Sequence, residues 1–135
     1  MKTLTLNLKR QYFDEILAGT KTHEYRDIFP ENVRKFVYYR IGDKTFHGDA
    51  ELPSEEEMPG EAIACPVEYD RIKFLTGAYI GKRPYMIVEV KSAEIKYAYD
   101  EEGEHVIGYD EARDVEFIVA QIDYTLGKII EVSDD

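Results

Sequence analysis

The chain has 135 residues, of which 44% are hydrophobic, so it can bury the core of one domain and is too apolar to be disordered throughout. Its net charge of −11 opposes binding to long polyanions, because neutralisation of phosphates by basic side chains supplies most non-specific affinity for nucleic acids. A single cysteine excludes an internal disulfide, and the chain has neither a membrane-length apolar run nor the apolar core of a signal peptide, so we expect a cytoplasmic protein without membrane contacts.

The acidic residues are concentrated in two segments. Residues 1–48 carry a net charge of +3 and residues 71–99 carry +4, whereas residues 49–70 carry −8 and residues 100–135 carry −10. Salt screens exposed charges beyond about 10 Å, so the acidic segments matter less for one nucleotide in a closed site than for a long strand. We therefore expect a small nucleotide or a short single strand as ligand, and no duplex DNA. A purely solubilising acidic surface is the alternative.

The first half of the chain is expected to mix strands and helices. Alternating leucines predict a strand over residues 3–8, and an apolar stripe at helical spacing predicts a helix over residues 9–18 that ends at Gly19. Residues 20–27 have the composition of a strand. A second apolar stripe over residues 33–41 predicts a second helix.

The second half is predicted to consist of strands and two acidic loops. The loops lie near residues 43–66 and 100–114, where proline, glycine and runs of glutamate interrupt the apolar pattern. Alternating or β-branched sequence predicts strands over residues 71–76, 85–91, 94–99, 115–122 and 128–132, with a turn at Leu126-Gly127 before the last. We expect a single α+β domain over residues 1–135: a small β-barrel of about six or seven strands with two helices in its N-terminal half.

A polar motif follows the first predicted helix. Gly19, Lys21, Glu24 and Arg26 have G-x-K-x-x-E-x-R spacing. Arg26 would bind a phosphate or carboxylate through two hydrogen bonds, and Lys21 would add a point charge. Glu24 would accept a hydrogen bond from a base edge, hold Arg26 or carry a proton. On spacing alone, a structural surface salt bridge remains the alternative.

Aromatic residues are the second feature, with 11 tyrosines and six phenylalanines. Nucleobases are recognised by stacking on aromatic faces, which contributes about 1–3 kcal/mol per base. Tyr25, Phe74 and Tyr79 are the candidates to line a site with the polar motif. The alternative is that Phe74 belongs to the core and that most tyrosines are half-buried strand residues.

The chain has no motif for a metal or a cofactor. Its three histidines lack metal-ligand spacing, and residues 100–105 do not match a calcium-binding loop. The phosphate-binding, dinucleotide-binding and G-x-S-x-G signatures are also missing from the sequence. We therefore expect neither metal nor cofactor.

The polar motif and the preceding run of residues 12–18 resemble the signature of the ASCH domain family. Residues 74–79 are similar to the family's F-x-x-G-Y segment, with one residue inserted. The resemblance implies a PUA-like β-barrel that recognises RNA or a nucleotide in a cleft between helices and barrel. Lys21, Glu24 and Arg26 would line that cleft, with Tyr25 and Tyr79 as the favoured aromatic contacts.

Two alternative functions stay open. Some members that resemble this chain hydrolyse the amide of acetylated cytidine, with a threonine nucleophile activated by a lysine, and others are proposed ribonucleases. Lys21 and Glu24 would be the catalytic residues of such an enzyme. Glu24 stands where that threonine would fall, and Thr22 is expected to point to the opposite face. The second alternative is a protein-interaction domain whose acidic loops bind a basic partner.

Overall fold

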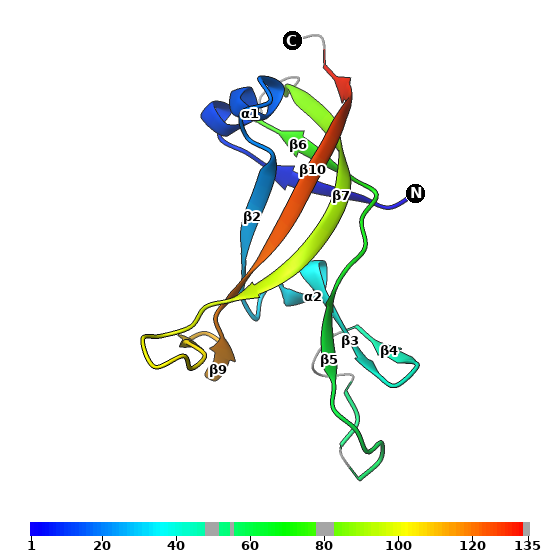
Figure 1. The fold of residues 1–135 in the computed structure, drawn as a ribbon, viewed down its shortest axis with the longest axis vertical. Helices are drawn as coiled ribbons and strands as arrows, with labels where there is room; N and C mark the ends of the chain where they lie inside the picture. Colours follow the sequence, from blue (N-terminus) through cyan, green and yellow to red (C-terminus); the bar gives the residue numbers. More distant parts are fainter. Residues whose placement is uncertain (48–51, 55, 78–82, 134–135) are drawn as a thin grey trace. The chain divides into compact units, whose positions relative to one another are not determined.

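The structure, a computed structural model, describes residues 1–47, 52–54, 56–77 and 83–133 (Figure 1). Strands dominate the described residues, and the helices are short, so the predicted mostly-β architecture is confirmed at that level. The helices are α1 (Arg10–Leu17) and α2 (Val33–Phe36). The strands are β1 (Thr3–Asn7), β2 (His23–Ile28), β3 (Val37–Ile41), β4 (Lys44–Phe46), β5 (Ile63–Pro66), β6 (Arg71–Leu75), β7 (Tyr85–Tyr97), β8 (Ile107–Asp110), β9 (Val115–Ile118) and β10 (Ala120–Val132).

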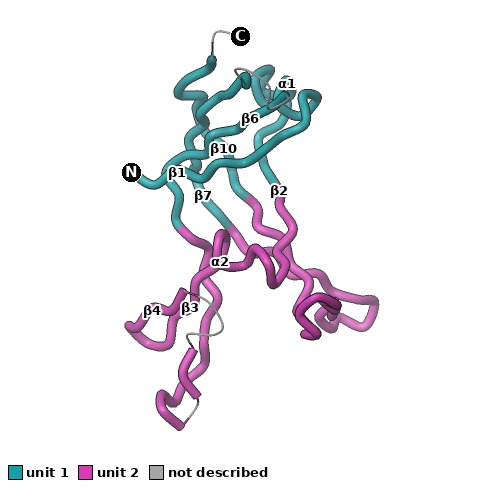
Figure 2. Tube along the Cα trace, turned by 180° about the vertical axis from the view of Figure 1, so that it is seen from behind, with its two compact units in different colours: residues 1–24, 68–93, 124–135 teal, residues 25–67, 94–123 magenta. Residues whose placement is uncertain are grey.

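The chain forms two compact units, each assembled from segments that are far apart in the sequence (Figure 2). Unit 1 contains Met1–Glu24, Glu68–Ala93 and Tyr124–Asp135. Unit 2 contains Tyr25–Val67 and Glu94–Asp123. The strands β2, β7 and β10 each continue from one unit into the other.

Three sheets account for the described strands. The largest has the order β1-β6-β7-β10-β2, the second has the order β4-β3-β5, and β8 pairs with β9. The pair β1–β6 is parallel, whereas β6–β7, β3–β4, β3–β5 and β8–β9 are antiparallel.

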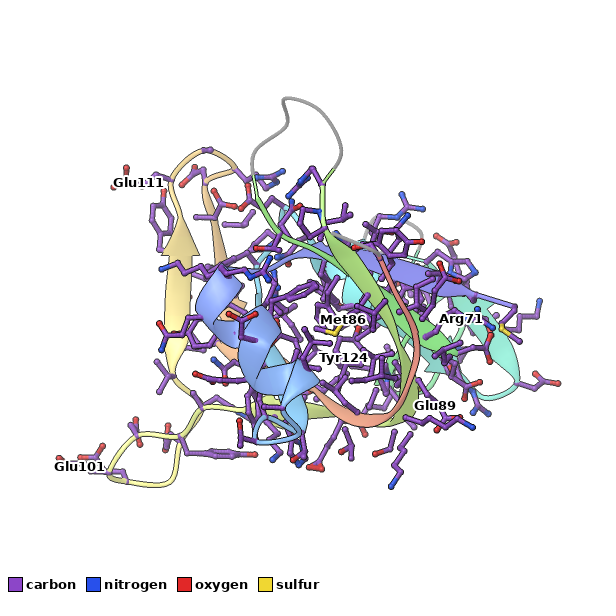
Figure 3. All side chains as sticks on the ribbon, turned by 90° about the horizontal axis from the view of Figure 1, so that it is seen from above. Arg71, Met86, Glu89, Glu101, Glu111 and Tyr124 are labelled. Carbon is purple, nitrogen blue, oxygen red and sulfur yellow. The ribbon has the colours of Figure 1, made fainter. Side chains whose placement is uncertain are left out.

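The core of unit 1 is built from alternate residues of β1, β6 and β7. Their register aligns two buried rows: Leu4, Ile72 and Val88 in one, and Leu6, Phe74 and Met86 in the other. Met86 and Tyr124 lie inside the curve of the strands, while Arg71 and Glu89 lie towards the outside (Figure 3). Full burial of an aliphatic side chain of this kind contributes about 1.5–3 kcal/mol, so these rows supply much of the stability of unit 1.

The predicted second helix is wrong beyond Phe36. The chain leaves α2 at Val37, whose φ of −133° and ψ of 138° are those of an extended residue, and continues as β3. The segment Val37–Ile41 has two β-branched and two aromatic residues, which favour a strand. Pairing with β4 on one side and β5 on the other satisfies its backbone groups.

The predicted acidic loops are also partly wrong. Residues 43–66 contain β4 and β5, and residues 100–114 contain β8 as well as a bridge between Tyr99 and His105. The strands in these stretches carry little of the acid: β4 and β5 have no acidic residue, and β8 has only Asp110, so pairing is compatible with the charge of the segments. Residues 48–51 and 55, which carry part of the first acidic run, lie outside the described residues.

Two predicted interruptions between strands do not occur in the described residues. Residues 85–97 form β7 without a break, and the turn expected at Leu126-Gly127 is an interior part of β10. Side chains of β7 come close to Gly127: a Cβ atom there would lie 2.5 Å from Oε1 of Glu89 and 3.2 Å from Cγ of Lys91, both in flexible side chains. The glycine therefore marks a close approach of side chains to a strand. None of the helices in the described ranges is long and apolar enough to cross a membrane.

Candidate functional site

The end of α1 sets the position of the polar motif. Gly19 has φ +79°, and its N–H donates to the carbonyl of Ile16 (3.1 Å), while the N–H of Thr20 donates to that of Glu15 (3.0 Å). These two bonds are the Schellman arrangement, which ends a helix on a left-handed residue, usually glycine. The N–H of Lys21 also donates to Glu15 (3.1 Å), so the backbone is held firmly up to the motif.

Lys21 and Glu24 form an ion pair within unit 1. Nζ of Lys21 lies 3.3 Å from Oε1 of Glu24, whose side chain is only 5% exposed, against 20% for Lys21. The ammonium also lies 5.7 Å from the centre of the Tyr12 ring on α1. A buried carboxylate is costly without partners, and Lys21 is one partner that stabilises Glu24 inside the fold.

A small pocket of about 300 Å³ lies beside this pair, wholly within unit 1. Lys21 and Thr22 contribute to its wall, together with the end of α1 and residues 126–129 of β10. Lys21 and Thr22 are therefore close together at this pocket, whichever way the Thr22 side chain points. Both residues precede β2, which begins only at His23, and strand alternation does not yet apply to them. The backbone there is tied to β10 by a hydrogen bond from the N–H of Leu126 to the carbonyl of Thr22 (2.9 Å).

The other predicted site residues are distributed differently. Arg26 is half-buried in β2, and it belongs to unit 2 together with Tyr25, whereas Lys21 and Glu24 belong to unit 1. Phe74 is fully buried in the core of unit 1, so its assignment as a ligand contact is wrong. Its alternation with Ile72 on β6, opposite Met86, explains the burial. Tyr79 lies outside the described residues.

Tyr25 belongs to a second polar cluster, which the sequence did not reveal. Nζ of Lys96 on β7 lies 2.9 Å from Oδ2 of the buried Asp123 on β10 and 5.8 Å from the centre of the Tyr25 ring. The hydrogen bond from Lys96 to Asp123, and the negative charge of Asp123, raise the pKa of Lys96. Tyr25 is 45% exposed, so the cluster lies at the surface of unit 2.

Tyr12 on α1 is a candidate site residue of unit 1 that was not predicted from the sequence. Its ring contacts the ammonium of Lys21, which lines the pocket, and the residue is 39% exposed. Its helical spacing suggested a core position. Only the turn after α1, which returns Lys21 towards the helix, shows that the ring has a polar neighbour.

Within the ranges that the structure describes, no group of three histidine, cysteine, aspartate or glutamate residues is arranged to hold a metal ion. Comparison with protein-family models, with curated protein sequences and with solved structures gives no match. The assignment of this site therefore depends on its own residues and geometry.

Proposed function

We propose that unit 1 binds a small nucleotide or the end of a single-stranded RNA, as an ASCH-type domain would. The site is formed by Tyr12, Lys21, Thr22 and Glu24 with the adjoining pocket, and we call it the Lys21 corner. The observation that carries the proposal is the buried Lys21–Glu24 pair beside a pocket of about 300 Å³. Such a volume is at the lower end of the range for small-molecule sites, so it suits one nucleotide better than several.

Residues of the Lys21 corner would contact different parts of a nucleotide. Lys21 is partly exposed and offers a positive charge to a phosphate, while Glu24 fixes its position and would accept from the amino group of a base. Tyr12 offers an exposed aromatic face for stacking. Because the N–H groups of Thr20 and Lys21 already donate to Glu15, the side chains must supply the polar contacts of this turn.

Titration with nucleotides, followed by two-dimensional NMR and calorimetry, tests the proposal. Lys21→Met should weaken binding about tenfold, the scale of one lost hydrogen bond to a charged group. Lys73→Met is the matched control, because Lys73 is also half-buried in unit 1 and also lies over a tyrosine ring, that of Tyr85 at 4.6 Å. Equal losses in the two variants, or no binding by the native chain, would rule out the site.

Arg26→Ala provides a separate test of how far the ligand extends. Arg26 belongs to the motif but to unit 2, and it does not line the Lys21 pocket. A loss of about tenfold or more in nucleotide affinity would include Arg26 in the site. An unchanged affinity would restrict the site to unit 1.

A second candidate is hydrolysis of RNA or of an acetylated nucleoside at the same corner. It is favoured by one observation: Lys21 and the hydroxyl-bearing Thr22 line the same pocket, with Glu24 buried next to Lys21. Binding ranks first because it needs only the ion pair and the pocket beside it, whereas hydrolysis also needs a general base positioned for Thr22. Incubation with 4-acetylcytidine and short RNAs, with product detected by mass spectrometry, distinguishes the candidates. Turnover that is lost in Thr22→Val would establish the enzyme.

A further inference from the structure

Unit 2 contains a second and larger pocket of about 600 Å³, far richer in aromatic side chains than the first. It is lined by residues of α2, β3, β5, β7 and β9 and by adjoining loops, all of them in unit 2. Five aromatic residues and a histidine contribute to its wall: Phe29, Tyr39, Tyr97, Tyr99, His105 and Phe117.

The aromatic rings support one another. His105 is stacked on Tyr99, with 4.9 Å between the ring centres, and meets Tyr97 edge-on at 5.4 Å. Phe29 and Phe117 form a further edge-to-face pair at 6.0 Å. The bridge between Tyr99 and His105, and the pairing of β8 with β9, fix the backbone from which several of these rings project. The wall is therefore preorganised and does not depend on ligand to form.

These rings are more exposed than a core would allow. Tyr99 is 59% exposed, and Phe29 and Tyr97 are about two-fifths exposed. Of the 14 large apolar residues that are exposed in the described ranges, nine belong to unit 2. Four of these nine line the pocket, namely Phe29, Tyr97, Tyr99 and Ile118, and exposed apolar side chains gathered at one pocket are typical of an interaction site.

The charged residues in and around the pocket favour a positively charged ligand. Among the residues that the structure describes, the acidic or basic ones that line it, apart from His105, are Glu61 and Glu116. Unit 2 as a whole has seven lysines and arginines against 19 acidic residues, a net charge of −12. Glu101 and Glu111, at two turns of this unit, project outward (Figure 3). A phosphate-bearing ligand would be repelled, and a cation would be attracted.

We propose that this pocket binds an arginine side chain presented by a basic peptide segment of a protein partner. A guanidinium stacks on tyrosine faces and is desolvated more readily than an ammonium. Its planar set of N–H donors matches a carboxylate such as that of Glu61 or Glu116. The site is independent of the Lys21 corner, since no residue is shared between the two pockets.

The test is calorimetric titration of the full chain with a short glycine-serine peptide that carries two arginines. The control ligand has citrulline in place of both arginines, which keeps the shape and removes the charge. We expect the arginine peptide to bind at least fivefold more tightly than the citrulline peptide. Equal affinity of the two peptides, or no binding of either, would overturn the proposal.

Matched pairs of variants test whether the arginine peptide binds in this pocket. Tyr99→Leu should weaken binding of the arginine peptide about fivefold, whereas Tyr109→Leu should not, because Tyr109 is similarly exposed in unit 2 but does not line the pocket. Glu116→Gln should weaken binding more than Glu111→Gln, which removes the same charge at a turn outside the pocket. Equal effects within each pair would indicate diffuse attraction to an acidic surface and overturn the pocket. A short RNA that competes with the peptide and is weakened by Tyr99→Leu would overturn it as well.

Discussion

Lys21 and Glu24 are three residues apart, a separation that places two side chains on opposite faces of a regular strand. They meet because Lys21 still belongs to the turn after α1, whereas Glu24 is the second residue of β2. The sequence predicted the motif and the helix end at Gly19. It did not predict the pairing, which depends on where the strand begins.

The Lys21–Glu24 pair should contribute more to stability than a surface ion pair. Lys21→Met would remove the partner seen for a carboxylate that is 5% exposed, and we expect a loss of about 1–3 kcal/mol in the free energy of unfolding. Adding Glu24→Gln should recover part of that loss, since the buried charge is then gone. Urea unfolding of the two single variants and the double variant measures the coupling. Purely additive effects would show that the two groups do not interact.

Lys96 should make stability depend on alkaline pH. Asp123 raises the pKa of Lys96 above its ordinary value of 10.5 by hydrogen bonding and by charge. A raised pKa in the folded state means that the stabilisation is complete below about pH 10.5 and is lost as pH rises through the higher folded value. The native chain should therefore be more stable than Lys96→Met below about pH 10.5. This difference in unfolding free energy should disappear as the pH rises through the folded-state pKa of Lys96.

Thermal unfolding across the alkaline range measures this difference. Lys91→Met, an exposed lysine of the same strand, is the control and should show a difference that does not change with pH. The cluster of Tyr25, Lys96 and Asp123 joins three strands that are far apart in the sequence. No spacing rule brings such residues together, which is why only Tyr25 was predicted as a site residue.

At the scale of elements, two strand glycines should respond differently to the same substitution. A Cβ at Gly108 on β8 would lie 2.6 Å from the Phe117 ring, the residue opposite on β9, and a rigid ring cannot yield easily. A Cβ at Gly127 on β10 would meet mainly the flexible end of Glu89. We expect Gly108→Ala to cost about 1–3 kcal/mol and Gly127→Ala less than about 1 kcal/mol.

Amide hydrogen exchange measures how each of these two substitutions affects the strands around it. Gly108→Ala should accelerate exchange of the amides of β8 and β9, and it should also weaken the arginine peptide, because Phe117 lines the larger pocket. Gly127→Ala should leave both properties unchanged. Equal exchange in the two variants would contradict the view that Phe117 packs rigidly over Gly108.

The errors in predicting elements have one physical origin. The apolar residues of β3 fit both a helical stripe and a strand, and only its partners β4 and β5 decide between them. Those partners lie in segments whose charge indicated loops. The first helix was predicted well because its signals, an apolar stripe and a terminal glycine, are local.

At the scale of the whole molecule, the charge of −11 is divided very unequally. Unit 1 has ten basic and nine acidic residues, a net charge of +1, so nearly all the excess acid belongs to unit 2. The overall charge therefore misrepresents the Lys21 corner, which lies in a nearly neutral unit. The overall net charge is close to that of unit 2, which contains the aromatic pocket.

This division predicts two different responses to salt. Nucleotide binding at the Lys21 corner should lose affinity only gently, with a slope of about −1 in log affinity against log salt, because one or two phosphates are neutralised. Binding should also gain little when the RNA is lengthened, since additional phosphates meet no further basic surface. The arginine peptide should lose affinity more steeply, because the 19 acidic residues of unit 2 attract it at long range. Calorimetry of both ligands from low to physiological salt measures the slopes. A steep slope for RNA would mean that the chain offers a broad basic surface, in conflict with the nucleotide-sized site proposed for unit 1.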